Sequence, residues 1–370
     1  MTQILVEDDP ILKIVPVILD PDTPPEHKNA VADFFSHDEP DFPGWCRRLQ
    51  SQIPGLYPVG VVLLRDEEDL KAKIGEADGI IVESLKVGRD VLGAARRLAI
   101  VQKFGTVIGN IDLDACKNRE IEVSTLRRRV NISVAEQALA LLMALARKVC
   151  ELGGVVEETS LRKAGYNPSP YDRRYTGNSN FSRIPGLKTL YGSTLGIVGM
   201  GEIGREIASR AGAFGMRILY YQRNQIRASD EEAMSARYAS LDEVLQQSDF
   251  VTIQLPLNAS TRNILGPREL QRIKPGAILV NIARADLIDR EALLAALDSG
   301  RLGGFGLDVG YSEPAKPDDP LLRYKKGNVI LMPHTAVGAR QNGLEDMEEM
   351  CLKLWHAIQR RSGAPLLQGS

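Results

Sequence analysis

The sequence predicts an α/β protein with two domains, each built on an open, doubly wound parallel sheet. Three observations support this prediction. The chain has 370 residues, which is enough for two domains of ordinary size. Short apolar runs alternate with helical stretches along most of its length, as in parallel strands covered by helices on both faces. A glycine-rich turn near residue 200 follows one such run and opens a helix, as in a βαβ unit.

In the first lobe, β-branched apolar runs alternate with helical patterns at residues 67–75 and 90–97. Runs of this length between turn residues predict buried strands. We expect these strands at residues 13–19, 59–64, 79–82, 98–101 and 121–123. The first lobe is therefore predicted to be a small α/β domain of the Rossmann-like or flavodoxin-like kind.

A long helix is expected next, over residues 133–152. Ser133, followed three residues later by Glu136, gives a capping-box pattern at its start. Residues 138–146 are apolar nearly all round, which predicts burial in a domain core or between domains or subunits. Residues 165–187 are rich in turn formers and lack periodicity, so a surface loop is expected there.

From residue 195 the alternation resumes, which predicts a second doubly wound sheet. Its strands are expected at residues 195–198, 217–221, 250–255, 277–282, 305–309 and 329–332. Helices are expected between them at residues 202–214, 241–247, 267–273 and 290–299, with a closing helix at 343–361.

Composition narrows the function classes. The net charge of -2 offers no basic surface for nucleic acid or an acidic membrane. The sequence lacks an apolar run of about 18 residues, and its start lacks a secretory pattern, so neither a membrane partner nor export is expected. The four cysteines are scattered without metal-ligand spacing, which predicts reduced thiols in a cytoplasmic protein without a metal site.

The turn at 199–204 reads Gly-x-Gly-x-x-Gly. Gly199 permits a tight turn, Gly201 lets a pyrophosphate approach the backbone, and Gly204 lets helix and strand pack closely. The helix start then favours phosphate. An ordinary turn is the alternative, but the flanking strand and helix favour a dinucleotide site. Its remaining contacts are predicted at Met200, Glu202 and Ile203.

Polar residues follow three strands of the second domain, at the edge where ligands bind in such sheets. Arg284, Glu313 and His334 come after the strands ending near 282, 309 and 332. Each alone is also compatible with an ordinary surface position. Together they suit hydride exchange with a 2-keto or 2-hydroxy acid, because arginine can hold a carboxylate or ketone oxygen and histidine can exchange the hydroxyl proton near neutrality. Glu313 would then orient the imidazole and favour its protonated form.

These features resemble the D-isomer-specific 2-hydroxyacid dehydrogenase family, and in particular its glyoxylate and hydroxypyruvate reductases, along nearly the whole chain. The resemblance rests on Gly199-x-Gly201-x-x-Gly204, on residues 280–289, on Gly306-Leu307-Asp308-Val309 with Glu313-Pro314, and on Met332-Pro333-His334. The runs Gly109-Asn110-Ile111-Asp112 and Val134-Ala135-Glu136 match in part.

The resemblance implies that the catalytic trio is Arg284, Glu313 and His334 and that Asp308 anchors the nicotinamide. It implies a substrate domain at 1–132 and 336–370, a cofactor domain at 133–335, a cleft between them and a homodimer. Further cofactor contacts are expected at Leu255, Pro256, Ile282, Ala283 and His334.

The chain departs from the family in places. Of the glycines that usually precede the Asn-Ile-Asp stretch, only Gly105 is kept, so the substrate loop at Gly105 and Thr106 has an unusual shape. Gln254 replaces a frequent histidine, and the loop at 165–187 is long. The run Arg127-Arg128-Arg129 is uncommon; it suits either a second anionic group on the substrate or a solvated basic face.

The strand ending at Tyr221 predicts NADP in preference to NAD. NAD enzymes carry an acidic residue there, which binds the ribose 2′-hydroxyl. Here the strand is followed by Gln222, Arg223 and Asn224, with Arg227 nearby, and Arg223 could pair with a 2′-phosphate. The alternative is that Gln222 tolerates both cofactors.

The predicted function is hydride transfer between NADP or NAD and a small 2-keto or 2-hydroxy acid of the D series. A nucleotide-sensing, corepressor-like binding protein is the alternative from another class. Formate, phosphite or phosphoglycerate oxidation are alternatives within the enzymes.

Overall fold

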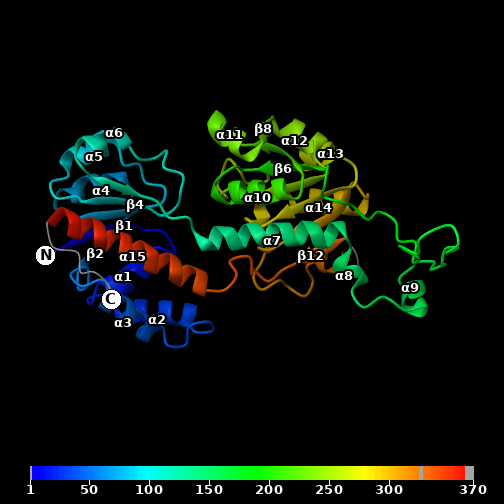
Figure 1. Cartoon of the computed structure of the whole chain (residues 1–370), viewed down its shortest axis with the longest axis horizontal. Helices are drawn as coiled ribbons and strands as arrows, with labels where there is room; N and C mark the ends of the chain where they lie inside the picture. Colours follow the sequence, from blue (N-terminus) through cyan, green and yellow to red (C-terminus); the bar gives the residue numbers. More distant parts are fainter. Residues whose placement is uncertain (1, 325–327, 363–370) are drawn as a thin grey trace. The chain divides into compact units, whose positions relative to one another are not determined.

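The computed structural model describes residues 2–324 and 328–362 and shows two compact units (Figure 1). Unit 1 consists of Met1–Asn131 and Gly338–Ser370, and unit 2 consists of Ile132–Val337. The chain therefore leaves unit 1, builds unit 2 and returns to unit 1 through its last helix.

Among its described residues, unit 1 holds a five-stranded parallel sheet in the order β2-β1-β3-β4-β5. The strands are β1 (Gln3–Glu7), β2 (Gly60–Leu64), β3 (Gly79–Val82), β4 (Ile100–Lys103) and β5 (Glu122–Ser124). The helices are α1 (Ile14–Leu19), α2 (Pro25–Phe35), α3 (Phe42–Gln52), α4 (Glu67–Lys73), α5 (Arg89–Ala94), α6 (Leu113–Asn118) and α15 (Gln341–Ser362), with the 3-10 turn η1 (Ile74–Glu76).

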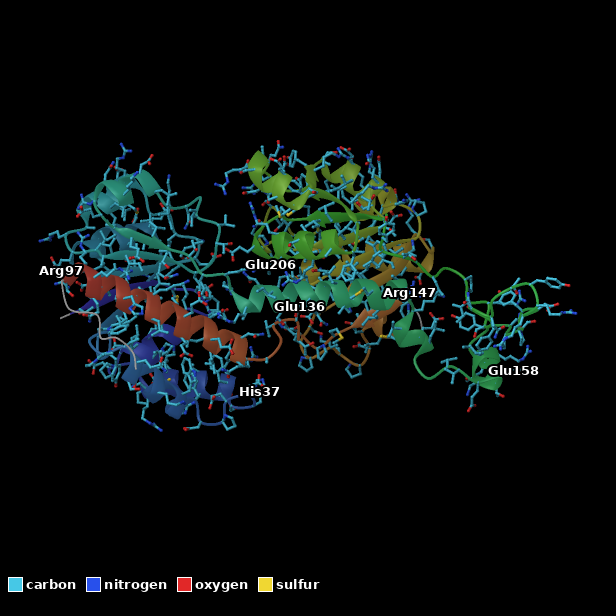
Figure 2. The ribbon with its side chains drawn as sticks, viewed as in Figure 1. His37, Arg97, Glu136, Arg147, Glu158 and Glu206 are labelled. Carbon is cyan, nitrogen blue, oxygen red and sulfur yellow. The ribbon has the colours of Figure 1, made fainter. Side chains whose placement is uncertain are left out.

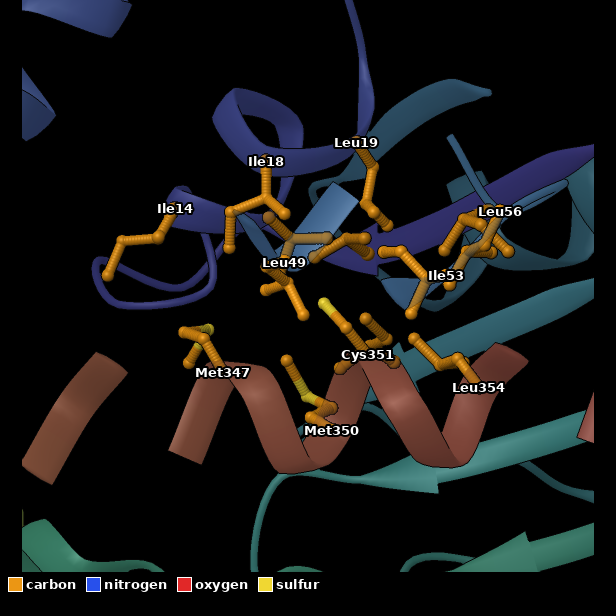
Figure 3. Close-up of a cluster of buried hydrophobic side chains, with 14 of the residues drawn as sticks. Ile14, Ile18, Leu19, Leu49, Ile53, Leu56, Met347, Met350, Cys351 and Leu354 are labelled. Carbon is orange, nitrogen blue, oxygen red and sulfur yellow. The ribbon is translucent and has the colours of Figure 1, made fainter. Parts of the chain in front are cut away.

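The core on one face of this sheet is closed by α15, the helix that returns from unit 2. Met347, Met350, Cys351 and Leu354 of α15 are fully buried against apolar side chains of α1 and α3 (Figure 3). The second face is covered by α4, α5 and α6, whose apolar side chains form a separate cluster. Residues more than 300 positions apart are thus joined in one core, as the hydrogen bond from Trp355 Nε1 to the Pro54 carbonyl illustrates (2.8 Å).

The strand predicted at residues 13–19 is wrong: this run is the helix α1, and the first strand is β1. All six residues of α1 are buried, and periodicity cannot separate a short helix that is buried all round from a buried strand. Pro16 is compatible with the helix because it lies in the first turn, where its missing N–H has no partner to lose.

The described residues of unit 2 form a seven-stranded parallel sheet in the order β12-β11-β10-β9-β6-β7-β8. The strands are β6 (Thr194–Val198), β7 (Arg217–Tyr221), β8 (Ala236–Tyr238), β9 (Phe250–Ile253), β10 (Ala277–Asn281), β11 (Leu302–Leu307) and β12 (Val329–Leu331). The six strands predicted for this region are present with small shifts at their ends. The short edge strand β8 escaped prediction because three residues carry too little periodicity.

Three helices precede the first strand of this sheet: α7 (Arg129–Ala146), which begins in unit 1, α8 (Val149–Leu152) and α9 (Glu158–Lys163). The connections between its strands hold α10 (Glu202–Ala213), α11 (Ala228–Met234), α12 (Leu241–Gln247), α13 (Pro267–Arg272) and α14 (Arg290–Asp298), with 3-10 turns η2 (Ala285–Leu287) and η3 (Pro320–Tyr324). Both sheets are therefore doubly wound α/β sheets, as predicted.

Helix α7 packs directly on β11. A Cβ atom at Gly304 would lie 3.3 Å from Leu145, and one at Gly306 would lie 3.3 Å from Leu141, so glycines permit the close approach. By length and composition α7 would suit a membrane span, and half of it is buried within the protein. Its apolar character is accounted for by this packing. Arg210 of α10 joins α10 to α7 by contacting both Glu206 (2.5 Å) and Glu136 (3.9 Å; Figure 2).

The predicted start of this helix at Ser133 is wrong. The helix begins at Arg129, where the carboxylate of Asp346 on α15 accepts the backbone N–H at 3.0 Å from both oxygens. A tertiary contact therefore replaces the local cap. The predicted end at Leu152 is interrupted, because Lys148 adopts a left-handed conformation (φ 53°) that separates α7 from α8.

The predicted surface loop at 165–187 contains neither helix nor strand and is largely exposed. Local contacts hold it, among them the guanidinium of Arg183 4.5 Å from the ring centroid of Tyr171 and the pairing of Arg174 with Asp172 (2.7 Å).

Candidate active site

The glycine turn between β6 and α10 has the conformation that its sequence requires. Gly199 has φ 107°, and a Cβ atom there would lie 2.9 Å from the carbonyl oxygen of Gln254. A Cβ at Gly204 would lie 2.2 Å from the carbonyl oxygen of Gly199, so only glycine fits. At Gly201 a Cβ would meet nothing within 4 Å. The turn therefore leaves open space at the start of α10, where Gly201 supplies no side-chain cap.

The end of β7 lies beside this turn. The side-chain oxygen of Gln222 accepts the N–H of Met200 (3.2 Å), and its side-chain nitrogen donates to the carbonyl of Asn224 (2.6 Å). Arg223 is exposed and donates to the hydroxyl of Ser260 (3.3 Å). The side chain of Gln222 is thus held in place by the glycine turn, while the adjacent guanidinium stays accessible.

Glu313 and His334 come together at the carboxyl edge of the sheet. His334 Nδ1 lies 3.1 Å from a carboxylate oxygen of Glu313, and both side chains are 43% exposed. An ionised carboxylate only accepts hydrogen bonds, so the contact places a proton on Nδ1. The other ring nitrogen, Nε2, is then available for proton exchange. The two residues follow β11 and β12, which are neighbours in the sheet.

The backbone at His334 is held by Asp308. His334 has φ 56°, an uncommon conformation for a residue other than glycine. Its N–H donates to the carbonyl of Asp308 (3.0 Å), and the buried carboxylate of Asp308 accepts the N–H groups of Thr335 (3.0 Å) and Ala336 (3.2 Å). The carboxylate of Asp308 thus fixes the turn that presents the imidazole.

A buried asparagine holds the turn that carries Arg284. Asn281 is fully buried at the end of β10; its side chain donates to the carbonyl of Arg284 (2.8 Å) and accepts the N–H of Ala283 (2.9 Å). Arg284 itself is exposed and donates to the carbonyl of Ala283 (2.8 Å). Arg284 follows β10, the strand beside β11, and among the described residues its guanidinium is hydrogen-bonded to Ala283 and not to Glu313 or His334.

The other predicted cofactor contacts lie along the same edge. Leu255 lies close to the glycine turn: a Cβ atom added at Gly199 would lie 3.0 Å from a methyl carbon of Leu255. The carbonyl of Pro256 accepts a hydrogen bond from the hydroxyl of Thr261 (2.6 Å). Ile282 is buried directly after β10. Gln254 donates to the hydroxyl of Thr252.

The predicted substrate residues Gly105 and Thr106 belong to unit 1 and follow β4. Gly105 has φ 153°, and its carbonyl accepts the N–H of Leu126 (2.9 Å), which ties this loop to the one after β5. Thr106 is exposed. Within residues 2–324 and 328–362, no group of three potential metal ligands gathers.

The sequence of this chain matches the model of a known protein family. The description of the matching model is "D-isomer specific 2-hydroxyacid dehydrogenase, NAD binding domain", and the match covers residues 139–336. The chain belongs to the D-isomer specific 2-hydroxyacid dehydrogenase family. It is therefore an oxidoreductase that exchanges a hydride between NAD(P) and a 2-hydroxy or 2-keto acid, and the matched residues are its NAD-binding domain.

Relatives of this dehydrogenase agree with the assignment. It is 39% identical over 285 residues to a glyoxylate reductase of Korarchaeum cryptofilum, covering 76% of this chain and 79% of that one. It is 36% identical over 277 residues to a D-3-phosphoglycerate dehydrogenase of Methanocaldococcus jannaschii, covering 74% of this chain and 48% of that one. Among solved structures, a glyoxylate reductase from Paecilomyes thermophila is similar with a TM-score of 0.53 and 27% identity, covering 99% and 98% of the two chains.

The glycine turn of this dehydrogenase fits a dinucleotide. The open space at Gly201, the forced glycines on either side and the uncapped start of α10 together form a cradle for an anionic pyrophosphate.

The roles of two residues were not predicted from the sequence. Asn281 lies within the 280–289 motif, and an asparagine at the end of a buried apolar strand is itself a signal that its amide has a specific partner. Ser260, the partner of Arg223, lies 37 residues away in the sequence and gave no signal.

Proposed function

We propose that this dehydrogenase is a reductase of small 2-keto acids of the glyoxylate type, yielding D-2-hydroxy acids. The observation that carries the proposal is the 3.1 Å pair of Glu313 and His334 at the carboxyl edge of the cofactor sheet, one strand away from Arg284. Relatives that are named glyoxylate reductases support the choice of substrate.

In the proposed reaction, Glu313 holds the imidazole in place through Nδ1. His334 then donates the Nε2 proton to the ketone oxygen, which becomes the hydroxyl group of the product. Arg284 binds the ketone oxygen and the carboxylate and so orients the carbonyl carbon. A nicotinamide cofactor, when bound, would supply the hydride to that carbon. Gly105 and Thr106 are proposed to bind the substrate carboxylate through the substrate loop, and Asp308 to contact the nicotinamide.

The substrate assignment is tested with a panel of keto acids. Purified protein is assayed for NADPH and NADH oxidation with glyoxylate, hydroxypyruvate, pyruvate and phenylpyruvate. We expect the smallest acids to give the highest kcat/KM. Cofactor binding without turnover of any acid would contradict the reductase assignment and would favour a nucleotide-sensing protein.

We further propose that NADP is preferred over NAD. The described residues directly after β7 include no carboxylate to bind a ribose 2′-hydroxyl or to repel a phosphate. Arg223 is exposed beside the glycine turn, whereas Arg227 is engaged with Asp230 (3.1 Å). Arg223 is therefore the cation that we assign to the 2′-phosphate.

Replacing Arg223 with alanine should raise the KM for NADPH about 10- to 100-fold, the loss expected for a charge-assisted hydrogen bond. The KM for NADH should stay nearly constant. Steady-state kinetics with both cofactors measure this difference. Arg237→Ala, which removes another exposed arginine of the same sheet, is the matched control. An equal loss with both cofactors would overturn the NADP assignment.

We propose that the protein is a cytoplasmic homodimer. Its four cysteines are all free, as expected in a reducing compartment.

The homodimer is supported by large apolar side chains that are exposed on the segment from α8 to β6. They are Val149, Val156, Tyr175, Phe181, Leu187 and Tyr191. Burial of these side chains against a second copy would account for their exposure. Sedimentation equilibrium should give twice the monomer mass, and a monomer at micromolar concentration would contradict the proposal.

A further inference from the structure

The three consecutive arginines after β5 have different surroundings. Arg129 is engaged with acidic residues of α15, contacting Asp346 (3.0 Å), Glu349 (2.9 Å) and Glu345 (3.1 Å). Arg127 is exposed. Arg128 packs against the loop that follows β4. The run is therefore not one solvated basic face.

Arg128 stacks on an aromatic ring beside the substrate loop. Its guanidinium carbon lies 4.1 Å from the centroid of the Phe104 ring, and Phe104 is buried and directly precedes Gly105. The Nε atom of Arg128 is buried and has no hydrogen-bond partner among the described residues. A stacked guanidinium keeps its planar donors in a fixed orientation, which suits recognition of a carboxylate or phosphate.

A second cation lies in the same loop cluster. Lys103, the last residue of β4, is only 5% exposed, and its ammonium donates to the carbonyl oxygen of Glu83. The loops after β4 and β5 are joined by the hydrogen bond from Leu126 to Gly105. Two cations from neighbouring strands thus flank the loop to which we assign the substrate carboxylate.

Two carboxylates, those of Glu7 and Glu83, belong to the surroundings of these cations. Glu7 is saturated by the N–H groups of Glu83 (2.6 Å), Ser84 (2.8 Å) and Leu85 (3.0 Å) and by the Ser84 hydroxyl. Burial raises the pKa of the Glu83 carboxyl, and the charges of Lys103 and Arg128 counteract this rise only in part.

We propose that Arg128, supported by Lys103, binds a second anionic group of the substrate, so that among 2-keto acids of similar size the enzyme favours the one with the second anionic group. This inference rests on the proposed function, because Gly105 and Thr106 must hold the first carboxylate. The second group is a carboxylate or a phosphate, because a guanidinium can donate two parallel hydrogen bonds to two oxygens of either group. Arg128 is a specificity residue and takes no part in proton or hydride transfer.

The test compares pairs of acids that differ by one anionic group. The full-length protein is assayed with oxaloacetate against 2-ketobutyrate, with 2-ketoglutarate against 2-ketovalerate, and with 3-phosphohydroxypyruvate against hydroxypyruvate. The first two pairs report a carboxylate and the third reports a phosphate. Arg128→Met removes the charge and keeps a side chain that packs on Phe104. Arg127→Met is the matched control.

For the wild type we expect at least one dianion to exceed its monoanionic partner about 10-fold or more in kcat/KM, through a lower KM. Arg128→Met should abolish this preference and leave kcat/KM for the monoanions within about twofold, whereas Arg127→Met should keep the preference. Absence of any preference in the wild type would overturn the inference. An equal loss for both members of each pair in Arg128→Met would do so too, because it indicates a structural role.

Calorimetric titration without cofactor separates this inference from the proposed function. If no keto acid is reduced, the proposed function fails, and binding alone decides the role of Arg128. Tighter binding of oxaloacetate than of 2-ketobutyrate, lost in Arg128→Met, would support the subsite. Equal binding of the two acids would overturn it.

Discussion

Replacing His334 with alanine is expected to lower kcat for keto-acid reduction about 1,000-fold. General acid catalysis by a positioned histidine contributes about 10²- to 10⁴-fold, and Glu313 holds this imidazole at 3.1 Å. The Kd for NADPH should change far less than kcat, because only the predicted contact of His334 with the cofactor is lost, whereas the glycine turn that follows β6, a different strand of the sheet, is untouched. Steady-state kinetics with glyoxylate and a fluorescence titration of NADPH measure the two quantities.

Two further variants make this result specific. His37→Asn removes an exposed histidine of unit 1 that contacts Asp38 (3.6 Å), and it should leave kcat unchanged (Figure 2). Glu313→Gln keeps a hydrogen-bond acceptor for Nδ1, so it should lower kcat much less than His334→Ala does. A His334→Ala variant with more than about a tenth of the wild-type kcat would remove His334 from the role of proton donor.

Replacing Arg129 with methionine is expected to reduce the free energy of unfolding of unit 1 by about 3 kcal/mol. Asp346 is 1% exposed and receives both the guanidinium and the backbone N–H of Arg129. Loss of the guanidinium leaves a buried carboxylate with backbone donors alone, and breaking a buried pair typically costs about 3–5 kcal/mol. Both tryptophans, Trp45 and Trp355, are buried in unit 1, so urea denaturation followed by tryptophan fluorescence reports this unit.

Arg147→Met is the control for this stability change. Arg147 is an exposed residue directly after α7 (Figure 2), and its loss should alter stability by less than about 0.5 kcal/mol. The double variant Arg129→Met, Asp346→Leu should recover part of the stability, because it replaces the pair with apolar groups. If Arg129→Met is no less stable than Arg147→Met, the pair with Asp346 does not hold the start of α7.

The cofactor half of the fold was predictable because its determinants are local. Gly199, Gly201 and Gly204 specify a turn whose backbone admits no side chain at two of the three positions, and six apolar runs specify the strands around it. The carboxyl edge of a parallel sheet then places the residues after each strand on one side. That rule alone predicted that Glu313 and His334 would lie together, and the structure brings them into contact.

Only the tertiary structure decided the features that depend on distant partners. The run at 13–19 is a helix, α1, whose six residues are all buried where β2, α2 and α3 pack on it, and no local period records that environment. Asp346, 217 residues away, sets the start of α7, so the local capping box at Ser133 is unused. The same contact separates Arg129 from Arg128, which stacks on Phe104 instead. Local backbone geometry is determined by neighbouring residues, whereas burial and charge pairing depend on which distant segments come into contact.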